Sequence, residues 1–77
     1  MKRIKYYTIH CTEEERNRGV DHYERFDTEE EAKKRADEIN YSETEFISVE
    51  KHHEKYENDE WLPDWEMGDK WNERIDY

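Results

Sequence analysis

The stretch Phe26-Asp-Thr-Glu-Glu-Glu-Ala-Lys-Lys-Arg-Ala-Asp-Glu-Ile-Asn40 carries the clearest local signal for secondary structure in the chain. Thr28 followed by Glu31 has the spacing of a capping box. Asp27 followed by Glu30 offers the same box one residue earlier. Three glutamates at the start and three basic residues after them match the direction of the helix dipole. The stretch therefore predicts a helix that its terminal asparagine ends.

The buried side of this helix is expected to be narrow. Ala32, Ala36 and Ile39 recur at the spacing of one helix face, while most other positions are charged. Because alanine side chains are small, the helix can lie close to a sheet. We therefore expect it to pack on one face of a sheet, with the rest of its surface in water.

The residues on either side of the helix predict the sheet. Residues 2–12 are rich in Tyr, Ile and Thr and alternate between two faces, as do residues 20–26. Between them, Asn17-Arg18-Gly19 favours a turn, which predicts an antiparallel hairpin with a loop of about seven residues. Residues 45–56 predict a third strand, and their long charged continuation is typical of an edge strand. The predicted fold class is α+β: a small antiparallel sheet in the order strand, strand, helix, strand.

The segment 54–77 combines negative charge with aromatic area. It holds nine acidic and three basic residues together with all three tryptophans, Trp61, Trp65 and Trp71. A solvated tail would have little reason to contain such large apolar side chains, since they gain free energy only when buried. We therefore expect this segment to pack on or next to the rest of the domain, and in part to contact a partner.

Two local structures are compatible with the end of this segment. Gly68-Asp69 lies between two arms that carry apolar residues, which is compatible with a two-residue hairpin turn. The alternative is a loop followed by a short helix, which would bring Trp71 and Ile75 together one helical turn apart. The sequence favours neither.

Length and composition limit the chain to one small domain, residues 1–77. Its net charge is -10 and only ten residues are Leu, Ile, Val or Phe, a balance that approaches the composition of disordered proteins. Eleven aromatic residues compensate, since each can bury roughly 150 to 250 Å². We expect a marginally stable folded domain that gains stability from self-association or from a partner.

Composition also excludes several classes of function. The chain has no glycine-rich phosphate loop and no paired cysteines, and so little apolar material leaves scant room for a catalytic pocket. We therefore expect a protein that is not an enzyme and uses no cofactor. Cys11 alone can form no internal disulfide, and the basic start lacks the apolar run of a signal peptide or a membrane span. The expected location is the cytoplasm.

Metal binding is the chemistry that the sequence leaves open. The candidate ligands on the predicted strands are His10, Cys11, His22, His52 and His53. Neighbours in a strand point to opposite faces, so at most one of each adjacent pair could join His22 in a site. We expect these histidines to be partly exposed or hydrogen-bonded on the sheet, with a metal-binding regulator as the alternative.

The acidic surface is the strongest functional signal. A net charge of -10 exceeds the magnitude of about 2 to 8 that solubility alone requires of a small domain. This charge disfavours direct contact with nucleic acid or anionic lipid and attracts basic protein surfaces. The candidate partner-binding residues lie at the helix start and beside the tryptophans: Glu29, Glu30, Glu31, Asp59, Glu60, Trp61, Asp64, Trp65, Glu66 and Trp71. For residues 29–31, capping and the helix dipole offer a purely structural alternative.

In general character the chain resembles the small acidic proteins that bacteriophages encode to block host enzymes, including anti-CRISPR and DNA-mimic inhibitors. The resemblance lies in the order of elements, the helix start Phe26-Asp-Thr-Glu-Glu-Glu-Ala-Lys-Lys and the Trp-rich acidic end. It implies a bacterial host cell and a protein target such as a nuclease, restriction factor or nucleoid protein. The alternative is a structural module that forms a homodimer through its tryptophans.

Overall fold

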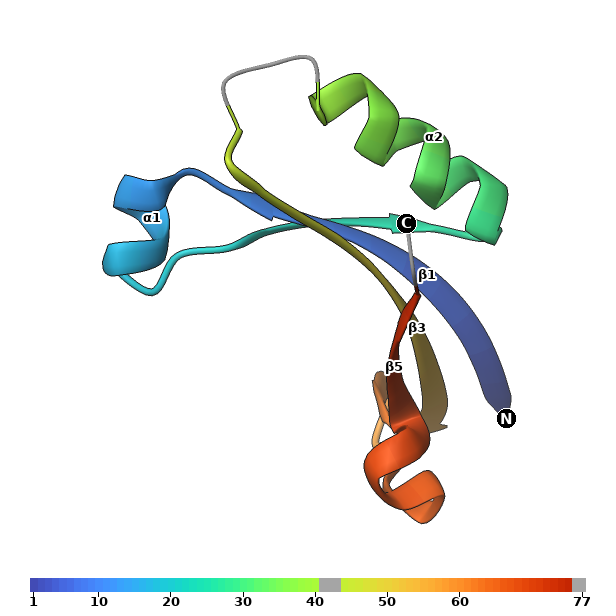
Figure 1. Ribbon diagram of the computed structural model, residues 1–77. Coiled ribbons are helices and arrows are strands. Elements are labelled where there is room, and N and C mark those ends of the chain that lie inside the picture. Colours follow the sequence, from blue (N-terminus) through green and yellow to red (C-terminus); the bar gives the residue numbers. More distant parts are fainter. Residues whose placement is uncertain (41–43, 76–77) are drawn as a thin grey trace.

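A computed structural model describes residues 1–40 and 44–75, so the last two residues of the acidic segment lie outside the described part. Five antiparallel strands form one curled sheet, and a helix lies against one of its faces (Figure 1). The predicted α+β class is confirmed. The elements are β1 (Lys2–Cys11), α1 (Glu13–Asn17), β2 (His22–Phe26), α2 (Glu29–Asn40), β3 (Phe46–Glu57), β4 (Glu60–Pro63), the 3-10 helix η1 (Trp65–Trp71) and β5 (Asn72–Ile75).

The sheet is built around β1 and β3. β1 pairs with β2 on one side and with β3 on the other, and both pairings are antiparallel. β4 and β5 both pair with the remaining side of β3, β4 beside its C-terminal part and β5 nearer its N-terminal part. β2 therefore forms one edge of the sheet, and β4 and β5 share the opposite edge.

The predicted helix and its buried face are confirmed by α2. The hydroxyl of Thr28 accepts a hydrogen bond from the backbone of Glu31 at 3.2 Å, which caps the first turn. Ala32, Ala36 and Ile39 are the buried residues of this helix, as the spacing predicts.

The core lies where α2 crosses the middle of the sheet. Val49 is fully buried against Ala32 and Ala36, and Tyr6 and Ile75 are among the side chains that pack around them. Opposite Val49 in the register is Thr8, which is also fully buried. The Thr8 hydroxyl donates a hydrogen bond to the carbonyl of Ala32 at 2.7 Å, so this buried polar group is satisfied.

The first two strands pair as predicted, but the prediction that only a loop joins them is wrong, because α1 forms between them. Thr12 accepts from the backbone of Glu15, and the Glu15 side chain accepts in return from the backbone of Thr12, which completes a capping box. The sequence carries this signal as a threonine followed three residues later by a glutamate. The short helix ends before Gly19, whose φ of 72° suits glycine.

The expectation that the third strand is an edge strand is also wrong, because β3 has partners on both sides. One of its buried charged residues, Glu54, is satisfied by side chains of β1. Glu54, 9% exposed, accepts hydrogen bonds from Arg3 at 2.7 Å and from Tyr7 at 2.8 Å. A carboxylate can lie in a central strand when such partners satisfy it. In the sequence those partners are about fifty positions away, so the charge pattern alone pointed to an edge.

The acidic segment does contain a hairpin turn and a short helix, but at other positions than those expected around Gly68. The hairpin turn lies earlier, at Asn58 and Asp59, whose φ angles are 54° and 63°. Gly68, with φ 60° and ψ -136°, instead kinks η1. The residues after η1 form strand β5, so Trp71 and Ile75 share no helix.

η1 is an excursion from an otherwise continuous edge strand. Pro63 lies opposite Glu54, and the backbone of Asp64 then donates to the carbonyl of His53 at 2.9 Å. The next pair in line is Asn72 opposite His52. The chain thus leaves the edge after residue 64 and rejoins it at residue 72. We call residues 65–71 the edge excursion; they form the orange helical turn at the bottom of Figure 1.

Candidate functional site

The edge excursion presents one exposed tryptophan on top of a partly buried one. The ring centroids of Trp65 and Trp71 are 5.5 Å apart, with the planes at 70°. Trp71 in turn meets the ring of His52 edge-on, with centroids 5.2 Å apart. Trp65 is 60% exposed. Trp71 therefore attaches the excursion to the sheet, and Trp65 is the tryptophan that a partner can reach.

Asp64 has a structural role rather than the expected partner-binding one. It is only 2% exposed, so the structure corrects its place among the surface candidates. Its carboxylate accepts from the backbone of Glu66 at 3.2 Å and lies 3.3 Å from the Lys2 ammonium. The N-cap bond fixes the start of the edge excursion, and the ion pair ties it to β1.

Glu66 lies within the edge excursion, on the surface, and has an ion-pair partner. Its carboxylate is 2.8 Å from the Lys2 ammonium, and that hydrogen bond lowers the pKa of Glu66. The side chain is 69% exposed, so water and salt screen the pair. Glu66 therefore stays accessible to a second cation.

The turn before β4 carries acidic groups with no internal partner. The carboxylates of Asp59 and Glu60 are exposed and take part in no ion pair or hydrogen bond between described residues. Trp61 follows them and is partly buried, with the Arg3 guanidinium 4.1 Å from its ring centroid. Because five residues in extended chain lie between Asp59 and Trp65, this turn and the edge excursion are separated by roughly 20 Å.

The helix-start candidates lie on the other edge of the sheet. α2 begins directly after β2, whereas the excursion interrupts the edge formed by β4 and β5, and Figure 1 shows the two at separate places. Glu31 exchanges hydrogen bonds with the capping hydroxyl of Thr28, and Glu29 is paired with Lys33 at 3.6 Å. Of the three, only Glu30 has a side chain with no ion pair or hydrogen bond within the described ranges. The predicted residues therefore form two separate groups.

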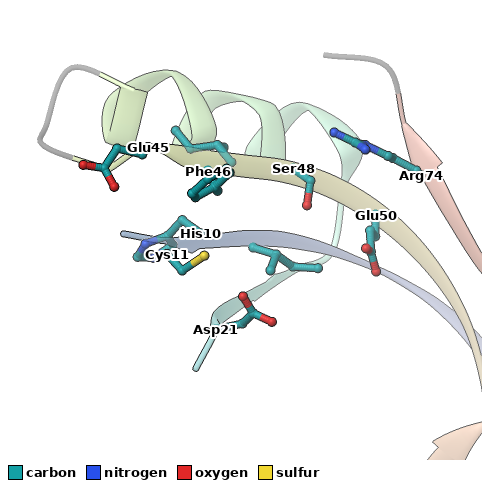
Figure 2. Close-up of a pocket in the computed structure, with 10 residues that line it drawn as sticks. His10, Cys11, Asp21, Glu45, Phe46, Ser48, Glu50 and Arg74 are labelled. Atoms are coloured by element: carbon teal, nitrogen blue, oxygen red, sulfur yellow. The ribbon is translucent and has the colours of Figure 1, made fainter. Parts of the chain in front are cut away.

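A cleft of about 300 Å³ lies at the end of the sheet near α1 (Figure 2). Cys11, Phe46, Asp21 and Arg74 are among the residues that line it. Cys11 is 4% exposed; burial, together with a hydrogen bond to Asp21, raises the pKa of its thiol. A thiol that stays protonated at neutral pH is a weak nucleophile, so this cleft offers no activated cysteine.

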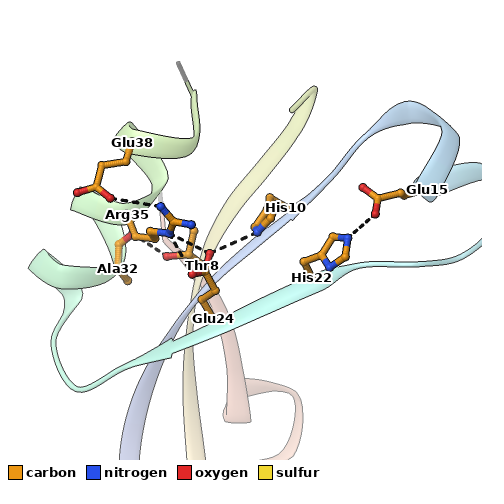
Figure 3. A network of polar contacts seen from close by, with 8 residues as sticks. All are labelled: Thr8, His10, Glu15, His22, Glu24, Ala32, Arg35 and Glu38. Carbon is orange, nitrogen blue, oxygen red and sulfur yellow. Dashed lines mark hydrogen bonds and ion pairs between the residues drawn. The ribbon is translucent and has the colours of Figure 1, made fainter. Parts of the chain in front are cut away.

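His10 on β1 and His22 on β2 take part in polar contacts with nearby carboxylates (Figure 3). His10 and His22 are directly opposite in the register, and their rings stack with centroids 5.3 Å apart. His10 lies 3.3 Å from the carboxylate of Glu24, which Arg35 also contacts at 3.0 Å. No three His, Cys, Asp or Glu side chains converge to hold a metal ion anywhere in residues 1–40 and 44–75.

One pocket was not expected from the sequence. An apolar groove of about 420 Å³ lies between the start of β1 and the edge excursion. Ile4 and Met67 line it and are 43% and 37% exposed. Alternation places Ile4 on the same face as Tyr6 and Thr8, but only the structure shows that α2 leaves Ile4 uncovered. Among the described residues, no helix has the length and apolar character that crossing a membrane requires.

The chain matches no protein-family model, no curated protein and no solved structure.

Proposed function

We propose that this chain is a non-enzymatic binding protein that docks on a basic, nucleic-acid-binding protein surface through its edge excursion and the neighbouring turn. The observation that carries the proposal is the exposure of Trp65, at 60%, on a segment that the sheet does not need. β4 and β5 would pair with β3 as one strand without residues 65–71. A looped-out segment that begins with an exposed indole is suited to contact another molecule, since tryptophan is enriched among interface hot spots.

Charge favours a basic partner for this surface. Residues 54–77 carry nine acidic and three basic residues, a balance of -6, out of the net charge of -10. The carboxylates of Asp59, Glu60 and Asp69 take part in no ion pair or hydrogen bond in the described part of the chain. Unpaired charge of one sign accelerates and orients association with a surface of the opposite sign.

The proposed contact surface is smaller than the set of residues expected from the sequence. It comprises Asp59, Glu60, Trp65, Glu66 and Asp69, with Trp61 and Trp71 supporting it from below. Asp64 is buried, and residues 29–31 lie on the opposite edge, where capping accounts for part of their charge. Binding there would block a nucleic-acid-binding site, so the chain would act as an inhibitor in a bacterial cell, in the manner of small acidic phage proteins.

Affinity capture from bacterial lysate tests this proposal. The variants are Trp65→Ala and the double charge reversal Glu60→Lys with Asp69→Lys. The matched control reverses Glu13 and Glu14, which lie on α1 beyond the other end of β1 and change the net charge equally. We expect the captured proteins to be basic nucleic-acid-binding proteins that added duplex DNA displaces. Loss of a hot-spot tryptophan should weaken binding by about 2 kcal/mol, roughly 30-fold.

Three outcomes would contradict the proposal. Capture that does not change between low and high salt would exclude a charge-driven contact. Capture that the control reversal weakens as much as the test reversal would show that only net charge matters. A captured set with no nucleic-acid-binding protein would exclude the proposed partner, and sedimentation of a stable dimer through the tryptophans would favour self-association instead.

A further inference from the structure

The groove beside the edge excursion is an exposed apolar concavity of about 420 Å³. Ile4 and Met67 line it from β1 and from the excursion. Ile4 lies opposite His53 in the register, on the face that α2 packs against. It is nevertheless 43% exposed, because α2 crosses the sheet further along, at Thr8 and Val49. The apolar side of the sheet thus continues beyond the helix and ends open to solvent.

Exposed apolar area of this kind, rimmed by charge, marks interaction sites in soluble proteins. The volume falls within the range of about 300 to 1,000 Å³ typical of ligand pockets, so a leucine, methionine or phenylalanine side chain has room. Met67 is part of the same seven-residue excursion that exposes Trp65. The groove and the proposed contact surface therefore meet at the edge excursion, with the groove on the face of the sheet that carries Ile4 and the tryptophan rings on the face that carries His52.

The rim of the groove is negative although two basic residues line it. Lys2 is held by Asp64 at 3.3 Å and by Glu66 at 2.8 Å. Arg3 is held by Glu54 at 2.7 Å. Asp64 and Glu66 thus outweigh Lys2 by one negative charge beside the groove, while the pair of Arg3 and Glu54 is neutral.

We propose that the groove receives an apolar side chain from a lysine- or arginine-rich segment of the partner, with the flanking cations on the acidic rim. This inference rests on the proposed function, and it adds the chemistry of the segment that the partner presents. Charge excludes the competing occupants: a second copy carries the same net charge of -10, and an anionic lipid surface would be repelled in the same way.

A methyl NMR experiment tests the groove without knowledge of the natural partner. The chain has two methionines, so a protein labelled at the methionine methyl groups gives one signal from Met67 and one from Met1. The probe is a short synthetic helical peptide of leucine and lysine. Two comparison peptides separate the contributions, one of leucine and glutamate and one of serine and lysine.

We expect the leucine and lysine peptide to shift the Met67 methyl signal saturably, and the two comparison peptides to leave it in place. Ile4→Thr and Met67→Gln should each weaken binding of that peptide about tenfold, as expected for the loss of one buried apolar side chain. The matched control is Val20→Thr, at a valine that is 37% exposed outside the groove. For the Met67→Gln protein, the indole signal of Trp65 reports the binding.

Each other outcome overturns the proposal. An equal response to the serine and lysine peptide would show attraction by charge alone, and an equal response to the leucine and glutamate peptide would show apolar adhesion alone. If the leucine and lysine peptide moves the Trp65 indole signal but not Met67, the groove is wrong while acidic docking stands. No binding of that peptide refutes the groove, whereas the lysate capture above decides the proposed function separately.

Discussion

The imidazole of His52 and the indole of Trp71 meet edge-on, with ring centroids 5.2 Å apart and planes at 68°. His52 is 9% exposed and also lies against Tyr7, at 4.3 Å between ring centroids. This stack fastens the end of the edge excursion to the middle of the sheet. Trp65, which rests on Trp71, is largely exposed, and it is the tryptophan that the proposed function assigns to partner contact.

The two tryptophans should differ in their effect on stability. Trp71→Ala removes a partly buried ring and should lower the free energy of unfolding by about 2 kcal/mol, less than the roughly 3 to 5 kcal/mol of a fully buried tryptophan. Trp65→Ala removes a largely exposed ring and should lower it by about 0.5 to 1 kcal/mol, mainly the ring contact. Urea unfolding of the two variants measures the difference. Equal losses would contradict the assigned roles.

Asp64 should be more important for folding than its exposed neighbours. Asp64→Ala removes the N-cap of the edge excursion and leaves Lys2 with one carboxylate, so we expect a loss of about 1 to 2 kcal/mol. Asp69→Ala is the matched control, and it should change stability by no more than about 0.5 kcal/mol. Thermal unfolding compares them. If both variants melt like the wild type, the buried carboxylate does not hold the excursion.

Stability should depend on pH through Glu15. Hydrogen bonds from the backbone of Thr12 and from His22 lower the pKa of Glu15 from an ordinary value of 4.5 to about 2. Because the pKa is lowered in the folded state, the stabilisation is complete above the unfolded value and is lost as the pH falls through the folded value. Glu15→Gln should therefore lower the Tm most above pH 4.5 and approach the wild-type Tm near pH 2.

The matched control for this pH series is Glu14→Gln, at an exposed carboxylate on the same short helix. Its difference in Tm from the wild type should show no comparable change between pH 4.5 and pH 2. A Glu15→Gln difference that stays constant over this range would show that the charge of Glu15 contributes nothing to folding.

The two valines of the chain provide a test of the core. Val49 is fully buried under α2, whereas Val20 is 37% exposed. Val49→Ala should lower the free energy of unfolding by on the order of 2 kcal/mol, because it leaves a cavity. Val20→Ala should change it by no more than about 0.5 kcal/mol. A domain of this size has only roughly 4 to 12 kcal/mol in total, so calorimetry should resolve the difference easily.

Local signals predicted the helix and the first hairpin partner strands correctly. The Thr28 cap and the spacing of Ala32, Ala36 and Ile39 lie directly before α2 or within it, so the sequence is sufficient there. The capping box at Thr12 is equally local, and α1 could have been predicted from it. The turn residues Asn17 to Gly19, which indicate a loop, only end this short helix.

Long-range pairing explains what the sequence did not reveal. Glu54 belongs to a central strand because Arg3 and Tyr7 satisfy it, and those partners are adjacent only after β1 pairs with β3. The edge excursion has the same origin, since its ends are defined by where β4 and β5 meet β3. Trp65 and Trp71 are the same residue type, so the sequence cannot tell them apart. Their exposure differs because Trp71 packs on His52, whereas Trp65 packs on the outer side of Trp71.

The candidate site could be predicted in composition but not in shape. The charge and tryptophan content of residues 54–77 are the features of the sequence on which the proposed contact surface is based. The sequence could not show that Asp64 is buried, that residues 29–31 lie on the opposite edge, or that Ile4 and Met67 meet across a groove. Each of these facts depends on the order of strands in the sheet.

An NMR map of the bound surface tests the central proposal most directly. The chain has three tryptophans and hence three indole N–H signals, which can be followed while a captured basic partner is added to the 15N-labelled protein. We predict that the indole signal of Trp65 changes most, together with the backbone amides of residues 59–66. Changes confined to α1 or to residues 29–31, with the Trp65 indole signal unmoved, would contradict docking through the edge excursion.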